Sequence, residues 1–241
     1  MEIPGAQNTR RSLQVLRVLG QHHEAGLGVK DVVALTGLER STAHRLMTCL
    51  VEEHFAERDP NTRRYRLGLE AMRLGFATLT RAPLLSTCLP VLRRLARISG
   101  DTVFLLVRQG DYTVCLARED GAFPVKIFST RVGDIRPLGI GVAGLAMLAH
   151  QSDDEIERIR SQHSSAFDAA GLDAANLRRV IARTRRTGYS ELIDTVTEGV
   201  AGVGAAIPDP TMPFAAISIA AIKPRMTASR RNERIRPAKS S

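Results

Sequence analysis

Two amphipathic helices joined by a glycine turn constrain the fold of this chain more than any other feature. Apolar residues at helical spacing predict a short helix over residues 30–36, which Gly37 ends. A longer helix follows over residues 40–55, with one apolar face and an opposite face of hydroxyl groups and arginine. The pair is typical of a helix-turn-helix, although an ordinary amphipathic surface helix also has a polar outer face.

The next residues favour a DNA-binding unit. Two short strands, 56–59 and 64–67, flank a turn at 60–63, and this hairpin is rich in arginine. Together with a further helix predicted from Ser12 to Gly20, they form a winged helix-turn-helix. In such a unit the last helix enters the major groove and the wing contacts phosphates. The candidate DNA-binding residues are therefore Arg40, Ser41, Thr42, His44, Arg45, Arg58, Arg63, Arg64 and Arg66.

Three short runs in this region resemble the IclR family of bacterial transcriptional regulators: RSTAHRL at 40–46, ERDP at 57–60 and YRLG at 65–68. The resemblance extends to about Arg225 and implies an α+β protein. It would have a winged helix-turn-helix domain at 8–68, a dimerising linker helix at 69–82 and a GAF-like effector-binding domain with an antiparallel sheet at 83–226. Gly28 departs from the family, which often has Ser or Thr there as a helix cap. Gly is also an acceptable cap, so we expect only a small loss of helix stability.

The second half of the chain alternates between helical and strand-like segments. Helices are predicted at 84–98, 141–150, 153–160 and 173–186, and strands at 102–107, 112–117, 125–128, 200–207 and 214–222. This interleaving independently predicts an α+β domain.

The family resemblance also implies an effector pocket in this domain. Its expected residues are Leu138, Val142, Ala143, Leu192, Gly202, Ser218 and Ala220. In relatives that bind small keto acids, the positions matching Leu192, Gly202 and Ala220 are polar. Here they are apolar or lack a side chain, so we expect an effector with apolar area rather than glyoxylate or pyruvate. The alternative is that residues 189–205 are matched to the family's positions with an error of one or two residues.

Catalytic, metal and cofactor signatures are missing from the sequence. It contains no nucleophile elbow, zinc-binding helix or phosphate-binding loop. The glycine-rich run 199–204 is followed by Pro208 and Pro210, which exclude the helix of a dinucleotide site and favour close backbone packing beside a pocket. We therefore expect no enzyme activity, no cofactor and no metal.

Composition points to the cytoplasm. The three cysteines, Cys49, Cys88 and Cys115, form neither a disulfide framework nor a metal-ligand pattern, which suits a reducing compartment. No apolar run is long enough to cross a bilayer, and residues 1–6 do not resemble a signal peptide.

Most of the excess positive charge lies at the end of the chain. The net charge is +9, and residues 223–241 hold seven Lys and Arg against one Asp or Glu. We expect 227–241 to be disordered, because so polar a segment buries too little surface to offset its ordering entropy. This basic tail is either simply solvated or attracted to DNA phosphates without sequence preference.

The sequence thus predicts a cytoplasmic regulator that binds double-stranded operator DNA as a homodimer or dimer of dimers. A small-molecule effector would change its affinity for the operator. One alternative is a constitutive DNA-binding dimer whose second domain only oligomerises. The other is a small-molecule enzyme with an N-terminal interaction domain.

Overall fold

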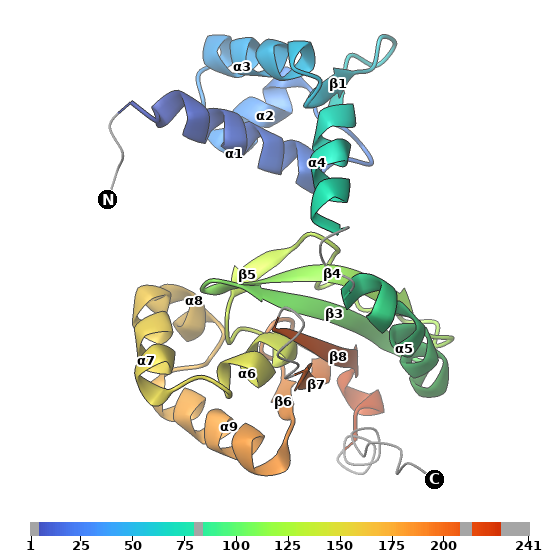
Figure 1. The fold of residues 1–241 in the computed structure, drawn as a ribbon, viewed down its shortest axis with the longest axis vertical. Coiled ribbons are helices and arrows are strands. Elements are labelled where there is room, and N and C mark those ends of the chain that lie inside the picture. The colour runs from blue at the N-terminus through green and yellow to red at the C-terminus, as the bar shows by residue number, and fades with distance from the viewer. Residues whose placement is uncertain (1–4, 80–83, 208–213, 228–241) are drawn as a thin grey trace. The chain divides into compact units, whose positions relative to one another are not determined.

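The computed structural model describes residues 5–79, 84–207 and 214–227. The chain divides into two compact units, Met1–Arg81 and Ala82–Ser241 (Figure 1). Each unit has an apolar core of its own, and each is described by itself.

The first unit is a three-helix core with a two-stranded wing. Its elements are α1 (Gln7–Gln21), α2 (Val29–Thr36), α3 (Arg40–Glu52), β1 (Ala56–Arg58), β2 (Tyr65–Leu67) and α4 (Leu69–Leu79). Val15, Val32 and Met47 bring one apolar face of each of the first three helices into a common core. Helix α2 stops at Gly37, whose left-handed backbone (φ 69°) favours glycine and whose N–H caps the Val33 carbonyl.

Two helix boundaries in this unit differ from the predicted ones. Helix α1 begins at Gln7 rather than Ser12 and continues through Gly20. Helix α3 ends at Glu52, three residues earlier than predicted. His54 takes a left-handed backbone conformation (φ 58°), which breaks the helix shortly before β1.

The second unit is built around one antiparallel sheet. Its strand order is β5-β4-β3-β8-β7-β6. The elements are α5 (Leu84–Ser99), β3 (Thr102–Gln109), β4 (Tyr112–Asp120), β5 (Ile135–Pro137), α6 (Val142–Leu148), α7 (Asp153–Gln162), α8 (Ser164–Ala169), α9 (Ala174–Thr187), β6 (Ser190–Ile193), β7 (Val200–Ile207), β8 (Ala215–Ile222) and a 3₁₀ turn (Lys223–Arg225).

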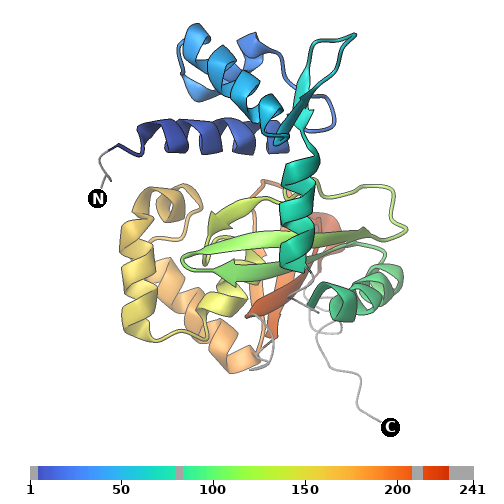
Figure 2. The same ribbon diagram turned by 45° about the horizontal axis from the view of Figure 1, so that its top comes forward.

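Helices cover both faces of this sheet. Figures 1 and 2 show α5 on one side and α6 to α9 on the other. Strand β3 serves both layers, because its side chains alternate between faces. Val103 and Leu105 pack in the core that includes α5, whereas Phe104 and Leu106 pack in the core that includes α6.

The prediction of a strand at 125–128 was wrong. This segment is a loop, in which Ile127 is buried while Val125 and Phe128 are exposed. The outer strand is β5 instead, which pairs with β4 from Tyr112 opposite Pro137 to Val114 opposite Ile135. A proline is tolerated in such an edge strand, because its missing N–H faces away from the sheet. The tail segment expected to be disordered lies, from residue 228 on, outside the described residues.

Candidate functional site

The N-terminal half of α3 presents a polar, basic surface. Arg40, Ser41, His44 and Arg45 are exposed and Thr42 is half-buried. The opposite face of the helix holds Ala43, Met47 and Leu50 in the core, so the helix cannot rotate these polar side chains inward. Neither Arg40 nor Arg45 forms an ion pair among the described residues. Both guanidinium groups are therefore available to an anionic partner.

The tip of the wing is a tight turn organised by Asp59. Its carboxylate accepts hydrogen bonds from the backbone N–H groups of Asn61 (2.9 Å) and Thr62 (2.8 Å). These bonds lower the pKa of the Asp59 carboxyl below its ordinary value. Arg63 stands exposed at the end of the turn with a left-handed backbone (φ 56°), and Arg58 lies over the ring of Tyr65.

The two remaining wing arginines face the loop between α1 and α2. Arg64 donates from Nε to the Ala25 carbonyl and from Nη2 to the Gly26 carbonyl, both at 2.9 Å. Arg66 donates to the Glu24 carbonyl at 3.4 Å. These bonds brace the wing against the rest of the unit. Phosphate contacts by Arg64 and Arg66, expected from the sequence, stay a prediction.

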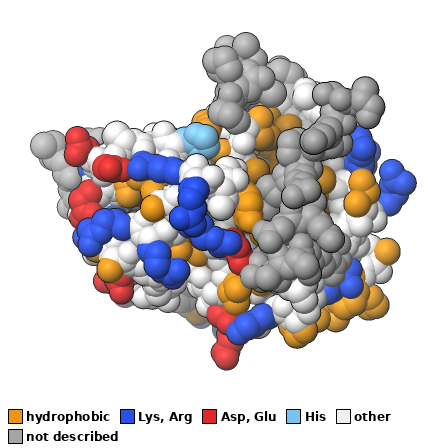
Figure 3. All heavy atoms as spheres, turned by 90° about the horizontal axis from the view of Figure 1, so that it is seen from below, with side chains coloured by type: hydrophobic (Ala, Val, Ile, Leu, Met, Phe, Trp, Pro, Cys, Tyr) orange, Lys and Arg blue, Asp and Glu red, His pale blue; other side chains and the backbone are white. Residues whose placement is uncertain are grey.

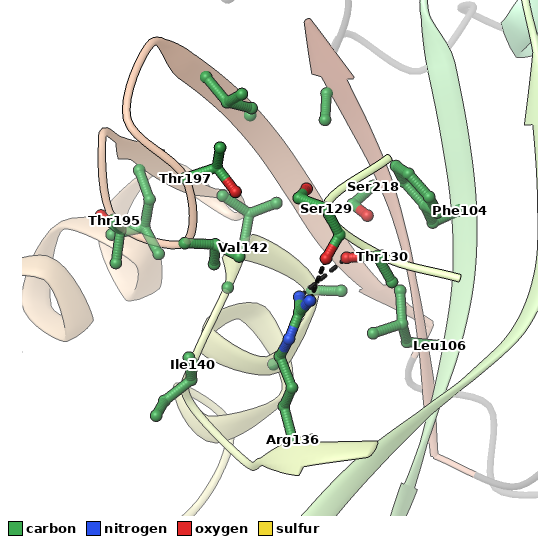
Figure 4. A pocket seen from close by; sticks show the side chains of 18 residues that line it. Phe104, Leu106, Ser129, Thr130, Arg136, Ile140, Val142, Thr195, Thr197 and Ser218 are labelled. Atoms are coloured by element: carbon green, nitrogen blue, oxygen red, sulfur yellow. Dashed lines mark hydrogen bonds between the residues drawn. The ribbon is translucent and has the colours of Figure 1, made fainter. Parts of the chain in front are cut away.

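The second unit contains a cavity between the sheet and the start of α6 (Figure 4). Its open space is about 570 Å³, part of which is continuous with solvent. Six of the seven residues expected at an effector pocket line it: Val142, Ala143, Leu192, Gly202, Ser218 and Ala220. Leu138 does not, because it is fully buried in the core beneath α6.

The glycines of β7 allow α6 to approach the sheet closely. A Cβ at Gly202 would lie 3.2 Å from Val142 Cγ2, and one at Gly204 would lie 2.8 Å from the Val142 carbonyl oxygen. Ser190 also holds the start of α6 against the sheet, since its hydroxyl donates to the Val142 carbonyl. The glycine-rich run thus packs against the wall of a cavity, as the sequence indicated.

One charged side chain, Arg136, lines this cavity within the described residues, and it was not predicted from the sequence. Arg136 lies on β5 opposite Thr113 of β4. Its guanidinium donates to Thr130 Oγ1 at 2.8 Å and to the Ser129 carbonyl. The sequence offered no signal for it, because a three-residue strand ending in proline shows no alternation.

Two of the three cysteines are buried and unreactive in the structure. Cys115 is almost completely buried, which raises the pKa of its thiol to about 11. Burial also raises the thiol pKa of Cys88, so both stay protonated near neutral pH. Across the described parts of the chain, no three His, Cys, Asp or Glu side chains gather as metal ligands.

The second unit mixes charges of both signs on its surface. Figure 3 shows Lys and Arg interspersed with Asp and Glu on one of its faces. Several of the arginines on α9 are paired, for example Arg183 with Glu191 and Arg185 with Asp153. Arg183 and Arg185 are thereby partly neutralised, whereas Arg40 and Arg45 of α3 have no ion pair among the described residues and are the better candidates for contact with a polyanion.

Comparisons with known proteins agree with this arrangement. Residues 9–60 match the IclR helix-turn-helix domain, and residues 76–240 match the bacterial transcriptional regulator IclR C-terminal domain. The chain belongs to the IclR family. It is a DNA-binding transcriptional regulator with an α+β fold, as the resemblance of its sequence motifs implied.

Individual IclR relatives match over most of their length. The chain is 30% identical over 217 residues to the glycerol operon regulatory protein of Streptomyces coelicolor, covering 88% of this chain and 84% of that protein. The IclR regulator of Alicyclobacillus acidocaldarius superposes with a TM-score of 0.79 at 19% identity, covering 98% and 94% of the two chains. An IclR homologue from Microbacterium hydrocarbonoxydans, complexed with 4-hydroxybenzoate, gives 0.70 at 23% identity, covering 95% of each. The two structural matches show a shared fold.

The family match corrects one expectation from the sequence. The resemblance was expected to end near Arg225, whereas the match to the IclR C-terminal domain continues to residue 240. The match thus covers most of the basic tail.

Proposed function

We propose that this regulator binds operator DNA as a homodimer, or as a dimer of dimers, and that a small molecule in the cavity of the second unit changes its affinity for the operator. The observation that carries the proposal is the cavity itself. It lies between the sheet and α6, in a different unit from the exposed basic face of α3. A related protein with the same fold holds 4-hydroxybenzoate, which supports a small-molecule effector here.

The DNA contacts follow from the exposed face of α3 and the tip of the wing. Arg45 and the hydroxyl groups of Ser41 and Thr42 would meet base edges in the major groove. Arg40 would enter the major groove beside them. His44, Arg58, Arg63, Arg64 and Arg66 would contact phosphates, which fix the position of the helix without reading sequence.

The effector would be largely apolar. Leu192, Gly202 and Ala220 supply no side-chain hydrogen-bond partner to a bound molecule. Phe104 and Leu106 add further apolar wall from β3. A two- or three-carbon acid would leave most of this apolar wall uncovered.

Dimer formation is supported by α4. Leu69, Met72 and Phe76 are each more than half exposed on this helix, and a second copy would remove them from water. We further propose that the protein acts by binding rather than catalysis, and that it works in the cytoplasm, where bacterial DNA lies. Of the helices that the structure describes, none has the length and apolar character of a bilayer span.

The test starts from genomic fragments that the full chain selects. The Arg45→Ala variant should bind a selected fragment more weakly by about 1–3 kcal/mol and with relaxed sequence preference. Arg17→Ala, which removes an exposed arginine from α1, is the matched control and should bind like the parent. Equal operator binding by all three proteins would refute the assignment of α3.

A second measurement separates the proposal from a constitutive binder. The affinity of the full chain for its selected fragment is compared with and without aromatic and aliphatic acids, 4-hydroxybenzoate among them. We expect at least one of them to change the dissociation constant severalfold. Operator affinity that none of these compounds changes would favour a second unit that only oligomerises, and turnover of a bound compound would favour an enzyme.

A further inference from the structure

We infer that Arg136 makes the cavity selective for a carboxylate group carried on an apolar body. The inference rests on the proposed effector cavity and adds the chemical class of its ligand. It concerns a side chain that no sequence motif indicated and that lies on β5 at the edge of the sheet.

The charge balance of the cavity points to an anion. Of the eighteen described residues that line it, only Arg136 is charged, and none is acidic. The nearest carboxylate, Asp134 Oδ2, lies 4.0 Å from Arg136 Nη2, at the limit of an ion pair. That oxygen also accepts the Arg131 backbone N–H at 2.8 Å. A half-buried guanidinium so weakly compensated attracts a negatively charged ligand.

The geometry of the guanidinium leaves donors for such a ligand. Thr130 and Ser129 occupy one N–H of each terminal nitrogen, out of the five N–H groups of an arginine. No other hydrogen bond of this side chain is present within the described chain. Figure 4 shows it extending between Val142 and the Ser129–Thr130 segment. These two bonds fix the orientation of the planar group, and a carboxylate can accept from it at two points.

The other side chains of the cavity wall determine which kind of molecule can carry the carboxylate. Phe104, Leu106, Ile140 and Val142 surround the space beside the guanidinium. An aromatic ring or a short alkyl chain would fill it, whereas a two-carbon acid would leave it empty. A single positive charge matches one carboxylate. A phosphate near −2 would keep an uncompensated charge in an apolar site, so a carboxylate is favoured.

Binding to the full chain tests this directly. Benzoate, phenylacetate and hexanoate are each compared with the corresponding amide by thermal shift and calorimetry. We expect at least one acid to raise the melting temperature, and its amide to bind at least about tenfold more weakly. Phenyl phosphate, the anionic alternative, should also bind more weakly than that acid.

Variants then assign the effect to Arg136. Arg136→Gln should weaken the acid at least about tenfold and remove its advantage over the amide, because it removes the charge-assisted hydrogen bonds. Arg136→Lys keeps the charge and should retain part of the advantage. Arg131→Gln is the control and should behave like the parent, because Arg131 is an exposed arginine in the loop before β5 that does not line the cavity. The melting temperatures without ligand show whether each variant is folded.

Three outcomes would overturn the inference. They are equal binding of acids and amides, full retention of acid binding by Arg136→Gln in a folded protein, and no binding of any acid. None of these readouts involves DNA. If the parent instead prefers acids through Arg136 but selects no genomic fragment, the proposed function fails and the inference stands.

Discussion

At the scale of single residues, Gly204 sets the distance between β7 and α6. Gly204→Ala should lower the stability of the second unit by about 1–3 kcal/mol, because the added methyl group meets the Val142 backbone, which cannot rotate away. Thermal unfolding of the full chain measures this. Gly75→Ala on α4 is the matched control, since a Cβ there meets no atom within 4 Å. The control should be neutral or slightly stabilising, and an equal loss in both variants would contradict the packing argument.

Substitution of Arg63 and of Arg64, which are neighbours in the wing, should have different effects. Arg63 is exposed, so Arg63→Ala should reduce the salt dependence of DNA binding by about one released counterion. Arg64 also donates to the Ala25 and Gly26 carbonyls, so Arg64→Ala should in addition destabilise the first unit by about 1 kcal/mol. Salt titrations of DNA binding and thermal unfolding of both variants check this. An equal loss of stability in the two variants would contradict the bracing role of Arg64.

At the scale of elements, an arginine network ties α7 to the turn between β3 and β4. Arg158 donates to Asp111 Oδ2 at 2.9 Å and to Glu155 Oε2 at 2.7 Å. Hydrogen bonds from Arg158 are the main reason that the pKa values of Asp111 and Glu155 lie below their ordinary values. Arg108 of β3 also contacts Glu155, which extends the network into the sheet.

This network predicts a pH dependence of stability. The two carboxyls have lower pKa values in the folded chain than in the unfolded one, so the unfolded chain takes up protons first as the pH falls. Their contribution is therefore complete at neutral pH and is lost through the acidic range below about pH 5. Arg158→Gln should lower the melting temperature at pH 7 and much less near pH 3. Arg179→Gln, whose side chain contacts Asn176 instead of a carboxylate, should show a difference that does not change with pH. If the effect of Arg158→Gln were the same at both pH values, the network would not be its cause.

Regular elements were the part of the fold that sequence could predict. Helices such as α3 and α9 bury one face, and burial leaves a periodic pattern that can be recognised. Strand β7 was predicted over its full length, Val200–Ile207, because turn residues bound an apolar run. Helix α8 has only six residues and was missed, since less than two turns give too short a pattern.

The cavity shows where such prediction stops. Its apolar residues were found through family resemblance, which supplies spatial neighbours that a single sequence does not. Arg136 lies on a short edge strand and Thr130 in the loop before it. Only the pairing of β5 with β4 brings them to the cavity. Leu138 was misplaced because it is one residue away from Pro137 of β5 but points into the core.

At the scale of the whole molecule, two copies should read a pseudo-palindromic operator. A two-fold dimer presents two α3 helices, so protected half-sites should lie about one helical turn apart, or a multiple of it. Footprinting of selected fragments measures this spacing. Phe76→Glu on α4 should weaken both dimer formation and cooperative occupancy of the half-sites, because it buries a charge at the proposed contact.

The matched control for that prediction is Ile98→Glu. Ile98 is an equally exposed apolar residue, but it lies on α5. Its substitution should leave the footprint unchanged. A single asymmetric half-site protected by the parent would count against dimeric reading.

The central pairing of the sheet has a consequence for a chain still being synthesised. Strand β8 lies beside β3, so that Phe104 faces Ser218 and Thr102 faces Ala220 across more than a hundred residues of sequence. Contacts this distant in sequence form only after the intervening chain has been made and ordered. Both strands contribute walls of the cavity. A nascent regulator on the ribosome therefore completes the helices of its first unit long before it can sense an effector, and responsiveness begins only when β8 has emerged.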